Sequence, residues 1–335
     1  MIEEYCRGWI DEFSSTGGIT RIRGWILHPT EALDSVTIHV DDRRLTHCPL
    51  APHDGVAKTF PIIPHGLLSG FTLEAAIQLP DNHARKIAVH GCRDGRPVAG
   101  FVWHALTAPD RHPLPPPHLR QRVAGSDSPE VFAQGYQSAM DLLTAAGRHR
   151  PLEGIGRVLD WGCGCGRVAR HLLDLLPKAE ILGCDIDGEA AAWANEHLPP
   201  GRFCQSGPFP PLPFADRQFD LVLGSSVMTH LTRDLQPRWL AEIRRVMRDG
   251  GLFLASVHGS FAAHFNGLAA ELERDGIHDG IIDRALDGIA PADYYRAVHQ
   301  TRAYTEAAWS EHFEILDYIT AGLMCFQDLV VMRAR

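Results

Sequence analysis

The sequence has no long run of basic residues, and its formal net charge is −9. Proteins that track nucleic-acid phosphates or anionic membranes present basic surfaces, so no nucleic-acid partner is expected. No apolar run approaches the roughly 18 residues that span a bilayer, and the first six residues include acidic side chains where a signal peptide needs positive charge. The sequence therefore predicts a cytoplasmic protein without a membrane span, whose partner is a small molecule or a glycan.

Metal-ligand motifs and disulfide patterns are also missing. The chain has 19 histidines and 8 cysteines, but it contains no HExxH motif and no paired CxxC. Four of the cysteines, Cys163, Cys165, Cys184 and Cys204, fall at predicted strand ends of one domain. We expect no metal site, and reduced thiols rather than disulfides.

Short β-type runs separated by turn residues fill the first 106 residues. Residues 36–40 alternate at period two, and Asp41-Asp42 and Asp94-Gly95 indicate hairpin turns. This pattern predicts a small antiparallel β-sandwich over 1–106. Trp9 and Trp25 fit two interpretations, a platform for stacking on sugars or core residues of the sandwich. The predicted strands are 19–27, 36–40, 71–79, 86–90 and 98–103.

A proline-rich stretch separates this region from the rest of the chain. Pro113 and Pro115-Pro116-Pro117 cannot donate backbone hydrogen bonds, so 107–127 is predicted to be an extended linker. After it, Ser128 and Pro129 are typical of the N-cap and first residue of an amphipathic helix. The second domain is therefore predicted to span 128–335.

Apolar strand-like runs alternate with amphipathic helices after residue 150. This alternation predicts an α/β fold with a doubly wound, mostly parallel sheet covered on both faces. The last two strands have too short a connection for a parallel crossover, so the final strand is expected to be antiparallel. The predicted strands are 157–161, 180–185, 202–205, 219–224, 252–257, 313–320 and 324–332, and the helices are 167–176, 189–197 and 235–248.

Asp160 ends the first of these strands, and Gly162, Gly164 and Gly166 follow it at alternate positions. Glycines there permit positive φ and a closer ligand approach than any Cβ allows. The next strand ends in Asp185, where a carboxylate can accept hydrogen bonds from ribose hydroxyls. Dinucleotide sites have GxGxxG instead of this GxGxG spacing. Since a carboxylate beside the turn repels a pyrophosphate and attracts an ammonium, the charge favours a sulfonium cofactor with a methionine moiety.

These residues resemble the first two motifs of class I S-adenosylmethionine-dependent methyltransferases. The resemblance extends over about 132–335: residues 211–220 are similar to that family's LPF-x-D-x-x-FD stretch, 226–231 to the following loop, and 239–251 to the next helix and turn. It implies a Rossmann-like fold with an antiparallel last strand, preceded here by the small all-β sandwich, and it implies S-adenosylmethionine as cofactor.

The same resemblance implies which residues bind the cofactor. Gly162, Cys163 and Gly164 would lie against the methionine and ribose, and Ile186 would pack on the adenine. Many members have an acid after the third strand for the adenine amino group, whereas this chain has Ser206-Gly207. The predicted cofactor-binding residues are Tyr136, Asp160, Gly162, Cys163, Gly164, Gly166, Asp185, Ile186, Ser206, Gly207 and Ser225.

Three histidines are candidates for a catalytic base. His230 follows the fourth strand, His258 follows the fifth, and His299 lies in an insertion before the sixth. Ligands of such sheets bind beyond the carboxyl ends of the strands, and histidine can accept a proton near neutral pH. For each one the alternative is a structural histidine, packed in a loop or lying at the surface.

Three hypotheses for function follow. The first is methyl transfer to a hydroxyl or amine of a sugar, a polysaccharide precursor or another small metabolite. The second keeps the fold but uses S-adenosylmethionine for other chemistry, such as cyclisation or aminocarboxypropyl transfer. The third is a non-catalytic protein that binds the cofactor.

Overall fold

The computed structural model of the chain describes residues 6–77, 79, 84–106, 111–129, 132 and 134–335. It contains two compact units. The first comprises 1–109 together with 261–269 and 324–326, and the second comprises 110–260, 270–323 and 327–335. Each unit has its own cluster of buried hydrophobic side chains.

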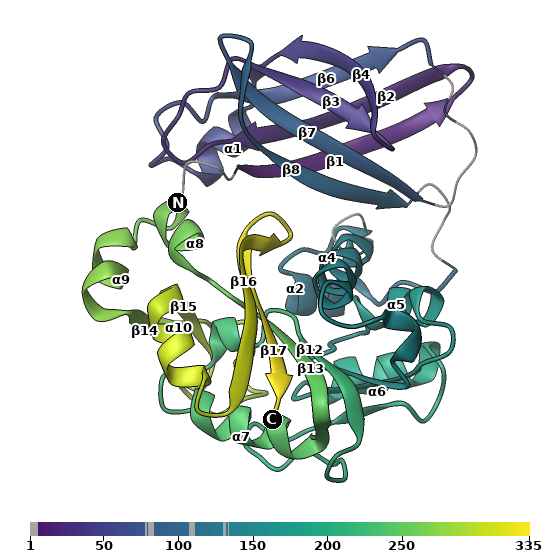
Figure 1. Cartoon of the computed structure of the whole chain (residues 1–335), viewed down its shortest axis with the longest axis vertical. Coiled ribbons are helices and arrows are strands. Elements are labelled where there is room, and N and C mark those ends of the chain that lie inside the picture. The colour runs from purple at the N-terminus through teal and green to yellow at the C-terminus, as the bar shows by residue number, and fades with distance from the viewer. Residues whose placement is uncertain (1–5, 78, 80–83, 107–110, 130–131, 133) are drawn as a thin grey trace. The chain divides into compact units, whose positions relative to one another are not determined.

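The first unit contains two four-stranded antiparallel sheets, in the orders β1-β2-β6-β5 and β4-β3-β7-β8 (Figure 1). Alternate residues of the strands face a shared core, which includes Ile22, Val36 and Val89. The turn residues Asp41 and Asp42 have positive φ, as the tight hairpin between β3 and β4 requires. The predicted all-β sandwich is confirmed. The elements are β1 (Arg7–Thr16), β2 (Ile19–Leu27), β3 (Ser35–Val40), β4 (Arg43–Pro49), β5 (Ala51–Pro52), α1 (Asp54–Thr59), β6 (Leu68–Ala75), β7 (Ala84–Arg93) and β8 (Arg96–Leu106).

Trp9 and Trp25, the two tryptophans with two interpretations, are partly buried. The Trp9 ring packs against Trp103 with 4.7 Å between ring centroids, and the Trp25 ring lies 5.9 Å from Phe60. Trp9 also packs against the hydrophobic core of the unit. These contacts favour the interpretation of both residues as packing residues of the sandwich over a platform for sugars.

The second unit is built on a seven-stranded sheet in the order β11-β10-β9-β12-β13-β17-β16. Its first five strands are parallel to one another, and β17 is antiparallel to both β13 and β16. The predicted doubly wound fold and antiparallel last strand are confirmed. The strands are β9 (Arg157–Trp161), β10 (Glu180–Asp185), β11 (Phe203–Gln205), β12 (Phe219–Gly224), β13 (Met247–Val257), β16 (Phe313–Leu323) and β17 (Gln327–Ala334).

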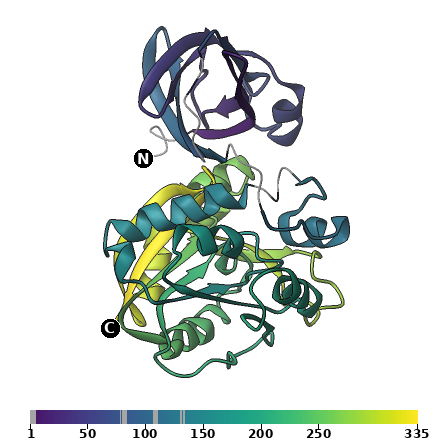
Figure 2. The ribbon, with the colours of Figure 1, turned by 90° about the vertical axis from the view of Figure 1, so that its right-hand side faces the viewer.

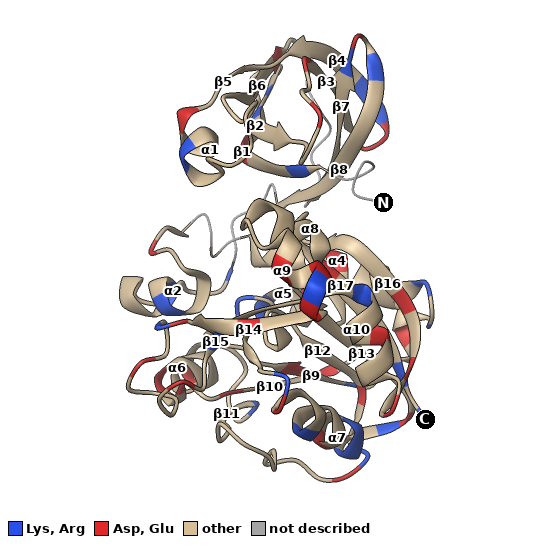
Figure 3. Ribbon diagram, turned by 90° about the vertical axis from the view of Figure 1, so that its left-hand side faces the viewer, with Lys and Arg blue, Asp and Glu red and all other residues tan. Residues whose placement is uncertain are grey.

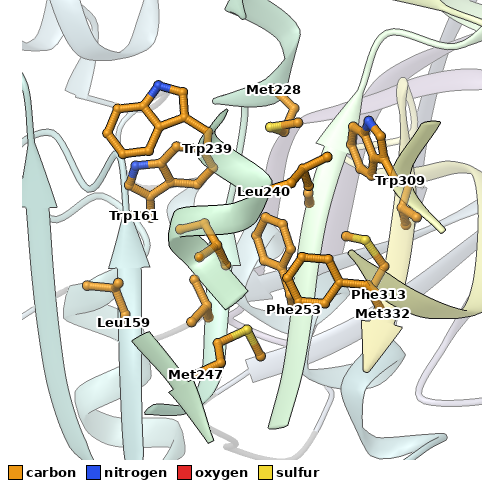
Figure 4. Close-up of a cluster of buried hydrophobic side chains, with 14 of the residues drawn as sticks. Leu159, Trp161, Met228, Trp239, Leu240, Met247, Phe253, Trp309, Phe313 and Met332 are labelled. Atoms are coloured by element: carbon orange, nitrogen blue, oxygen red, sulfur yellow. The ribbon is translucent and has the colours of Figure 1, made fainter. Parts of the chain in front are cut away.

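Helices lie on both faces of this sheet (Figures 1 and 2). Helices α7 and α10 pack on one face, where Trp239 and Trp309 join sheet residues such as Trp161 and Phe253 in one buried cluster (Figure 4). No helix within the described ranges combines the length and apolar character needed to cross a membrane. The helices of this unit include α4 (Gly135–Gly147), α5 (Ala169–Leu175), α6 (Gly188–His197), α7 (Gln236–Val246), α9 (Ala269–Asp275) and α10 (Arg302–Trp309), with one-turn 3-10 helices η1 (Leu152–Gly154) and η2 (Met228–His230). Helix α8 (Ser260–Phe265) belongs, except for its first residue, to the first unit.

The structure differs from the predicted linker at one end. Helix α2 (Pro117–Ala124) begins inside the stretch predicted to be extended. Pro117 occupies the first helical position, where a missing N–H costs nothing, and Gly125 ends the helix with φ 70°. The prolines therefore begin this helix instead of excluding it. The predicted helix after Ser128 includes 130, 131 and 133, which lie outside the described residues.

The segment between β13 and β16 contains a two-stranded antiparallel sheet of β14 (Ile277–Ile282) and β15 (Arg296–Gln300). A buried polar network fixes its second strand to the domain. Gln236 Nε2 donates to Gln300 Oε1 (2.7 Å), and Trp309 Nε1 donates to Gln236 Oε1 (2.9 Å). Because these buried amides have partners, the network holds β15 in a defined position.

Candidate functional site

The three glycines after β9 form a turn that other residues could not adopt without strain. Gly162, Gly164 and Gly166 have φ of 77°, 52° and 72°, a region that favours glycine. A Cβ on Gly162 would lie 2.4 Å from Val227 Cγ2, and one on Gly164 would lie 2.6 Å from Val123 Cγ1. Both the backbone conformation and the close packing therefore require glycine at these positions.

Asp160 is buried at the end of β9, with 2% of its surface exposed. Its Oδ2 atom is also buried, and it has no hydrogen-bond partner in the described part of the chain. Burial raises the pKa of this carboxyl to about 7, although the nearby Arg167 and the Ala169 backbone N–H lower it. A buried carboxylate oxygen without a partner is costly, so the site is incomplete until a donor such as an ammonium group binds.

Asp185, at the end of β10, joins the glycine turn to the next loop. Gly164 N–H donates to Asp185 Oδ2 (2.7 Å), and Asp187 N–H donates to Oδ1 (2.8 Å). Burial raises the pKa of Asp185 to about 6, and these hydrogen bonds oppose that shift. A carboxylate has about four acceptor positions, so it can still accept ribose hydroxyls. Its structural contact with Gly164 was not predicted from the sequence.

The remaining predicted cofactor residues around the strand ends have mixed environments. The Ser225 hydroxyl, after β12, is buried without a hydrogen-bond partner among the described residues, and Asp160 Oδ2 shares this property. The Ser206 backbone N–H donates to the Asp185 carbonyl (2.8 Å), and its hydroxyl bonds to the Cys184 thiol. The Ser206 hydroxyl is therefore already engaged within the protein. Gly207 is exposed, Ile186 is partly buried and Cys163 is buried.

Tyr136 lies in α4 and packs edge-on against His171 of α5, with 5.6 Å between ring centroids. Burial raises the pKa of its phenol. The neighbouring Gly135 lies against the Arg167 carbonyl, because a Cβ there would be 1.9 Å from that oxygen. The start of α4 is thus close to the end of the glycine turn, and the role of Tyr136 in binding the cofactor stays a prediction.

Helix α2 packs directly on the glycine turn, through the contact of Val123 with Gly164. Arg122 fixes the helix to the start of α6: its Nε lies 2.6 Å from Asp187 Oδ2, and its Nη2 lies 2.6 Å from Glu189 Oε2. Figure 3 shows basic residues on α2 and acidic residues on α6. The sequence carried one local signal for this helix, Pro117 followed by Gly125, which the proline run obscured.

His230 is held by the inserted segment between β13 and β16. Its Nδ1 lies 2.8 Å from the Arg296 carbonyl oxygen and 3.7 Å from Asp283 Oδ2. The ring stacks on Tyr295, with centroids 3.8 Å apart and planes inclined by 13°. Burial lowers the pKa of His230, and the carbonyl and the carboxylate oppose this effect. The imidazole is therefore neutral near pH 7.

His258 and His299 lie together, with 4.9 Å between their ring centroids. His258 Nε2 is 3.4 Å from Gln327 Nε2 on β17. His299 is only 2% exposed, and burial together with the neighbouring His278 lowers its pKa to about 4. The structure thus brings two of the three predicted histidines into one cluster and places His230 in a separate environment. Within the described residues, no group of three or more His, Cys, Asp or Glu side chains could hold a metal ion.

Residues 158–251 match a family model described as a methyltransferase domain. This segment of the chain is a methyltransferase domain. The matched segment includes the glycine turn, Asp185 and the loop with His230. The unpartnered Asp160 oxygen and the close glycine backbone fit the ammonium and methionine groups of S-adenosylmethionine, the cofactor that the resemblance implies.

Individual proteins similar to the chain cover only parts of it. A malonyl-(acyl-carrier protein) O-methyltransferase of Geobacter sulfurreducens is 36% identical over 107 residues, which are 31% of this chain and 39% of that protein. The arginine-hydroxylase NDUFAF5 of Mus musculus is 34% identical over 122 residues, 35% of this chain and 34% of that protein. The chain therefore spans well under half the length of these two curated relatives. A solved S-adenosylmethionine-dependent methyltransferase from Mesorhizobium loti is 18% identical, with a TM-score of 0.40, over 58% of this chain and 97% of that one.

Proposed function

We propose that the protein transfers the methyl group of S-adenosylmethionine to a hydroxyl or amine of a sugar, a polysaccharide precursor or another small metabolite. The observation that carries this proposal is the buried Asp160 Oδ2 atom, which lacks a partner in the described structure beside a turn of three positive-φ glycines. An ammonium group supplies both the charge and the donors that this oxygen lacks. Asp160 would hold the methionine end of the cofactor, and Asp185 would hold the ribose.

When bound, the cofactor supplies a methyl group on a positively charged sulfur, which an acceptor atom attacks in line. The protein contributes mainly by holding the two reactants in line and by removing a proton from acceptors that carry one. Three histidines, His230, His258 and His299, lie at or near the carboxyl edge of the sheet, where ligands of such folds bind. This placement supports an acceptor that loses a proton.

The names of the relatives also bear on the acceptor. One relative is named as an O-methyltransferase, which supports an oxygen acceptor. Another is named as an arginine-hydroxylase, and this name keeps chemistry other than methyl transfer as the second candidate.

The test uses the full chain and S-adenosylmethionine labelled in the methyl group. Panels of monosaccharides, nucleotide sugars, fatty alcohols, fatty acids and primary amines serve as acceptors. Methyl transfer must place the label in the acceptor and release S-adenosylhomocysteine. Methylthioadenosine would indicate attack at another carbon, and tight cofactor binding without any sulfur product would indicate a binding protein. Either of these results would contradict the proposal.

A further inference from the structure

The inserted segment between β13 and β16 surrounds His230 with three groups that determine its protonation. The Arg296 carbonyl and the Asp283 carboxylate lie on the Nδ1 side of the ring, and the Tyr295 ring covers one face. All three belong to the inserted segment, in which β14 pairs with β15 and Ile282 lies opposite Arg296. The environment of His230 is therefore built by residues far along the chain.

The contact with Arg296 fixes the position of the histidine proton. A backbone carbonyl can only accept a hydrogen bond, so Nδ1 must carry the hydrogen and donate it over 2.8 Å. A neutral imidazole then has its lone pair on Nε2. Nε2 has no hydrogen-bond partner within the described residues, and the side chain is 16% exposed. His230 thus presents a basic nitrogen that is open to an incoming group.

Asp283 stabilises the charge that His230 would acquire as a base. Its Oδ2 lies 3.7 Å from Nδ1, too far for a good hydrogen bond but close enough for strong electrostatic attraction to an imidazolium. Asp283 is the charged group that acts on this ring in the described structure, and Tyr295 is the titratable group stacked on it. The arrangement favours proton uptake at Nε2.

Two contacts bring this assembly next to the cofactor residues. Val227, which touches Gly162, accepts a hydrogen bond at its carbonyl from the His230 backbone N–H (3.0 Å). Burial raises the pKa of the Tyr295 phenol, and the charges of Asp283 and Asp185, which lie within electrostatic range of it, add to this shift. His230 is therefore anchored directly to the loop that lines the glycine turn.

We propose that His230 is the general base of methyl transfer, that Asp283 is its positioning residue, and that the acceptor atom is the oxygen of a hydroxyl group. This inference rests on the proposed function. His230 Nε2 takes the hydroxyl proton while the oxygen forms a bond to the methyl carbon and the carbon–sulfur electron pair leaves with sulfur. The neutral thioether departs as S-adenosylhomocysteine, and the proton passes from His230 to solvent.

The other two histidines are less suited to this role. His299 is buried, and its pKa of about 4 makes it a weak base. His258 has its Nε2 beside the Gln327 amide at 3.4 Å, so a neighbouring side chain already occupies that side of the ring. His230 instead combines a basic Nε2 with the Asp283 carboxylate behind the ring.

The first test needs no acceptor. Nitrogen-15 NMR of histidine-labelled protein, with the His230 signals assigned from His230→Gln, reports which ring nitrogen carries the proton. We expect the Nδ1–H form with a pKa below the ordinary value, and we expect Asp283→Asn to lower that pKa further because it removes a negative charge. An Nε2–H form would overturn the proposal, whatever the activity of the enzyme.

The second test compares the turnover of the variants with that of the wild type on the hydroxyl acceptor that the wild type uses best. It also compares the affinity of each protein for S-adenosylmethionine. His230→Gln should lower kcat by about 10²- to 10⁴-fold, the range of general-base catalysis, with the Kd for the cofactor unchanged within about twofold. Asp283→Asn should lower kcat less and move the acid limb of the pH profile to lower pH, and Asp283→Glu should restore part of the rate. His312→Gln is the control, because His312 precedes β16 at the opposite edge of the sheet.

The outcomes separate the two proposals. If the wild type methylates an acceptor and His230→Gln is within threefold of it, the base is elsewhere and the proposed function stands. A wild type that transfers methyl only to amines or carbon would also overturn the hydroxyl assignment. If the wild type methylates nothing, the proposed function fails, and the NMR tautomer still decides whether the His230 arrangement exists.

Discussion

Replacing Asp160 with asparagine should make the cofactor-free protein more stable and at the same time weaken cofactor binding. Burial raises the pKa of Asp160 from 3.8 to about 7. When the pKa of a carboxyl is higher in the folded protein than in the unfolded chain, the folded protein loses stability as the pH rises from the lower pKa to the higher one. At about 1.4 kcal/mol for each pKa unit, ionised Asp160 costs the folded state about 4 kcal/mol above pH 7.

The asparagine side chain of Asp160→Asn cannot ionise, so the variant avoids this cost, although its buried amide offsets about 1–3 kcal/mol of the gain. The change of the unfolding free energy with pH is a sharper measure, because the cost of burying the amide does not depend on pH and cancels in the comparison. Between about pH 5 and pH 8, the wild type should lose about 3 kcal/mol of unfolding free energy relative to Asp160→Asn. The affinity for the cofactor should change in the opposite direction, and Asp160→Asn should bind S-adenosylmethionine more weakly. Loss of the carboxylate that pairs with a buried ammonium should cost about 2–5 kcal/mol, or at least 30-fold in Kd.

Urea unfolding at both pH values, without cofactor, measures the first effect, and calorimetric titration with S-adenosylmethionine measures the second. Asp174→Asn is a suitable control, because this carboxylate lies on α5, the helix that follows the turn, and is 41% exposed. A variant that is less stable than the wild type at both pH values, by equal amounts, would refute the assignment of a raised pKa. Unchanged cofactor affinity would refute the binding role.

Three further predictions concern the surroundings of the site. Gly162→Ala should reduce stability by about 1–3 kcal/mol more than Gly201→Ala in urea unfolding, because both glycines have positive φ but only Gly162 lacks room for a Cβ; equal losses would contradict the close packing. Arg122→Gln should speed hydrogen exchange over 117–124 and cofactor dissociation several-fold, since its ion pairs hold α2 on the glycine turn; unchanged exchange would show that other contacts hold the helix. Gln236→Leu should cost about 2–4 kcal/mol in urea unfolding, because it leaves the buried Gln300 amide oxygen without its donor; a loss below about 0.5 kcal/mol would contradict this.

The parts of the fold predicted best are those whose signal is local. The bounds of β9 and β10 match the predicted ranges, because each strand is a short apolar run that ends directly at a turn residue or a carboxylate. The hairpin at Asp41 and Asp42 was predicted for the same reason, since positive φ at consecutive residues is a property of the turn itself.

The parts missed depend on contacts between distant segments. Strands β14 and β15 are short, interrupted by polar residues, and stabilised by pairing with each other and by the buried Gln236 and Gln300 amides. No local pattern indicates that Asp283 lies behind His230, because the fold alone brings them together. Helix α2 was missed because its prolines have opposite meanings in a linker and at a helix start.

The central claim is that the turn after β9, with Asp160 and Asp185, binds S-adenosylmethionine. Calorimetric titration of the wild-type chain with S-adenosylmethionine, S-adenosylhomocysteine and NAD tests it most directly. We predict one site per chain for the first two ligands, which share the methionine ammonium that Asp160 would hold, and no measurable binding of NAD. Binding of NAD at comparable affinity, or no binding of S-adenosylmethionine, would contradict it.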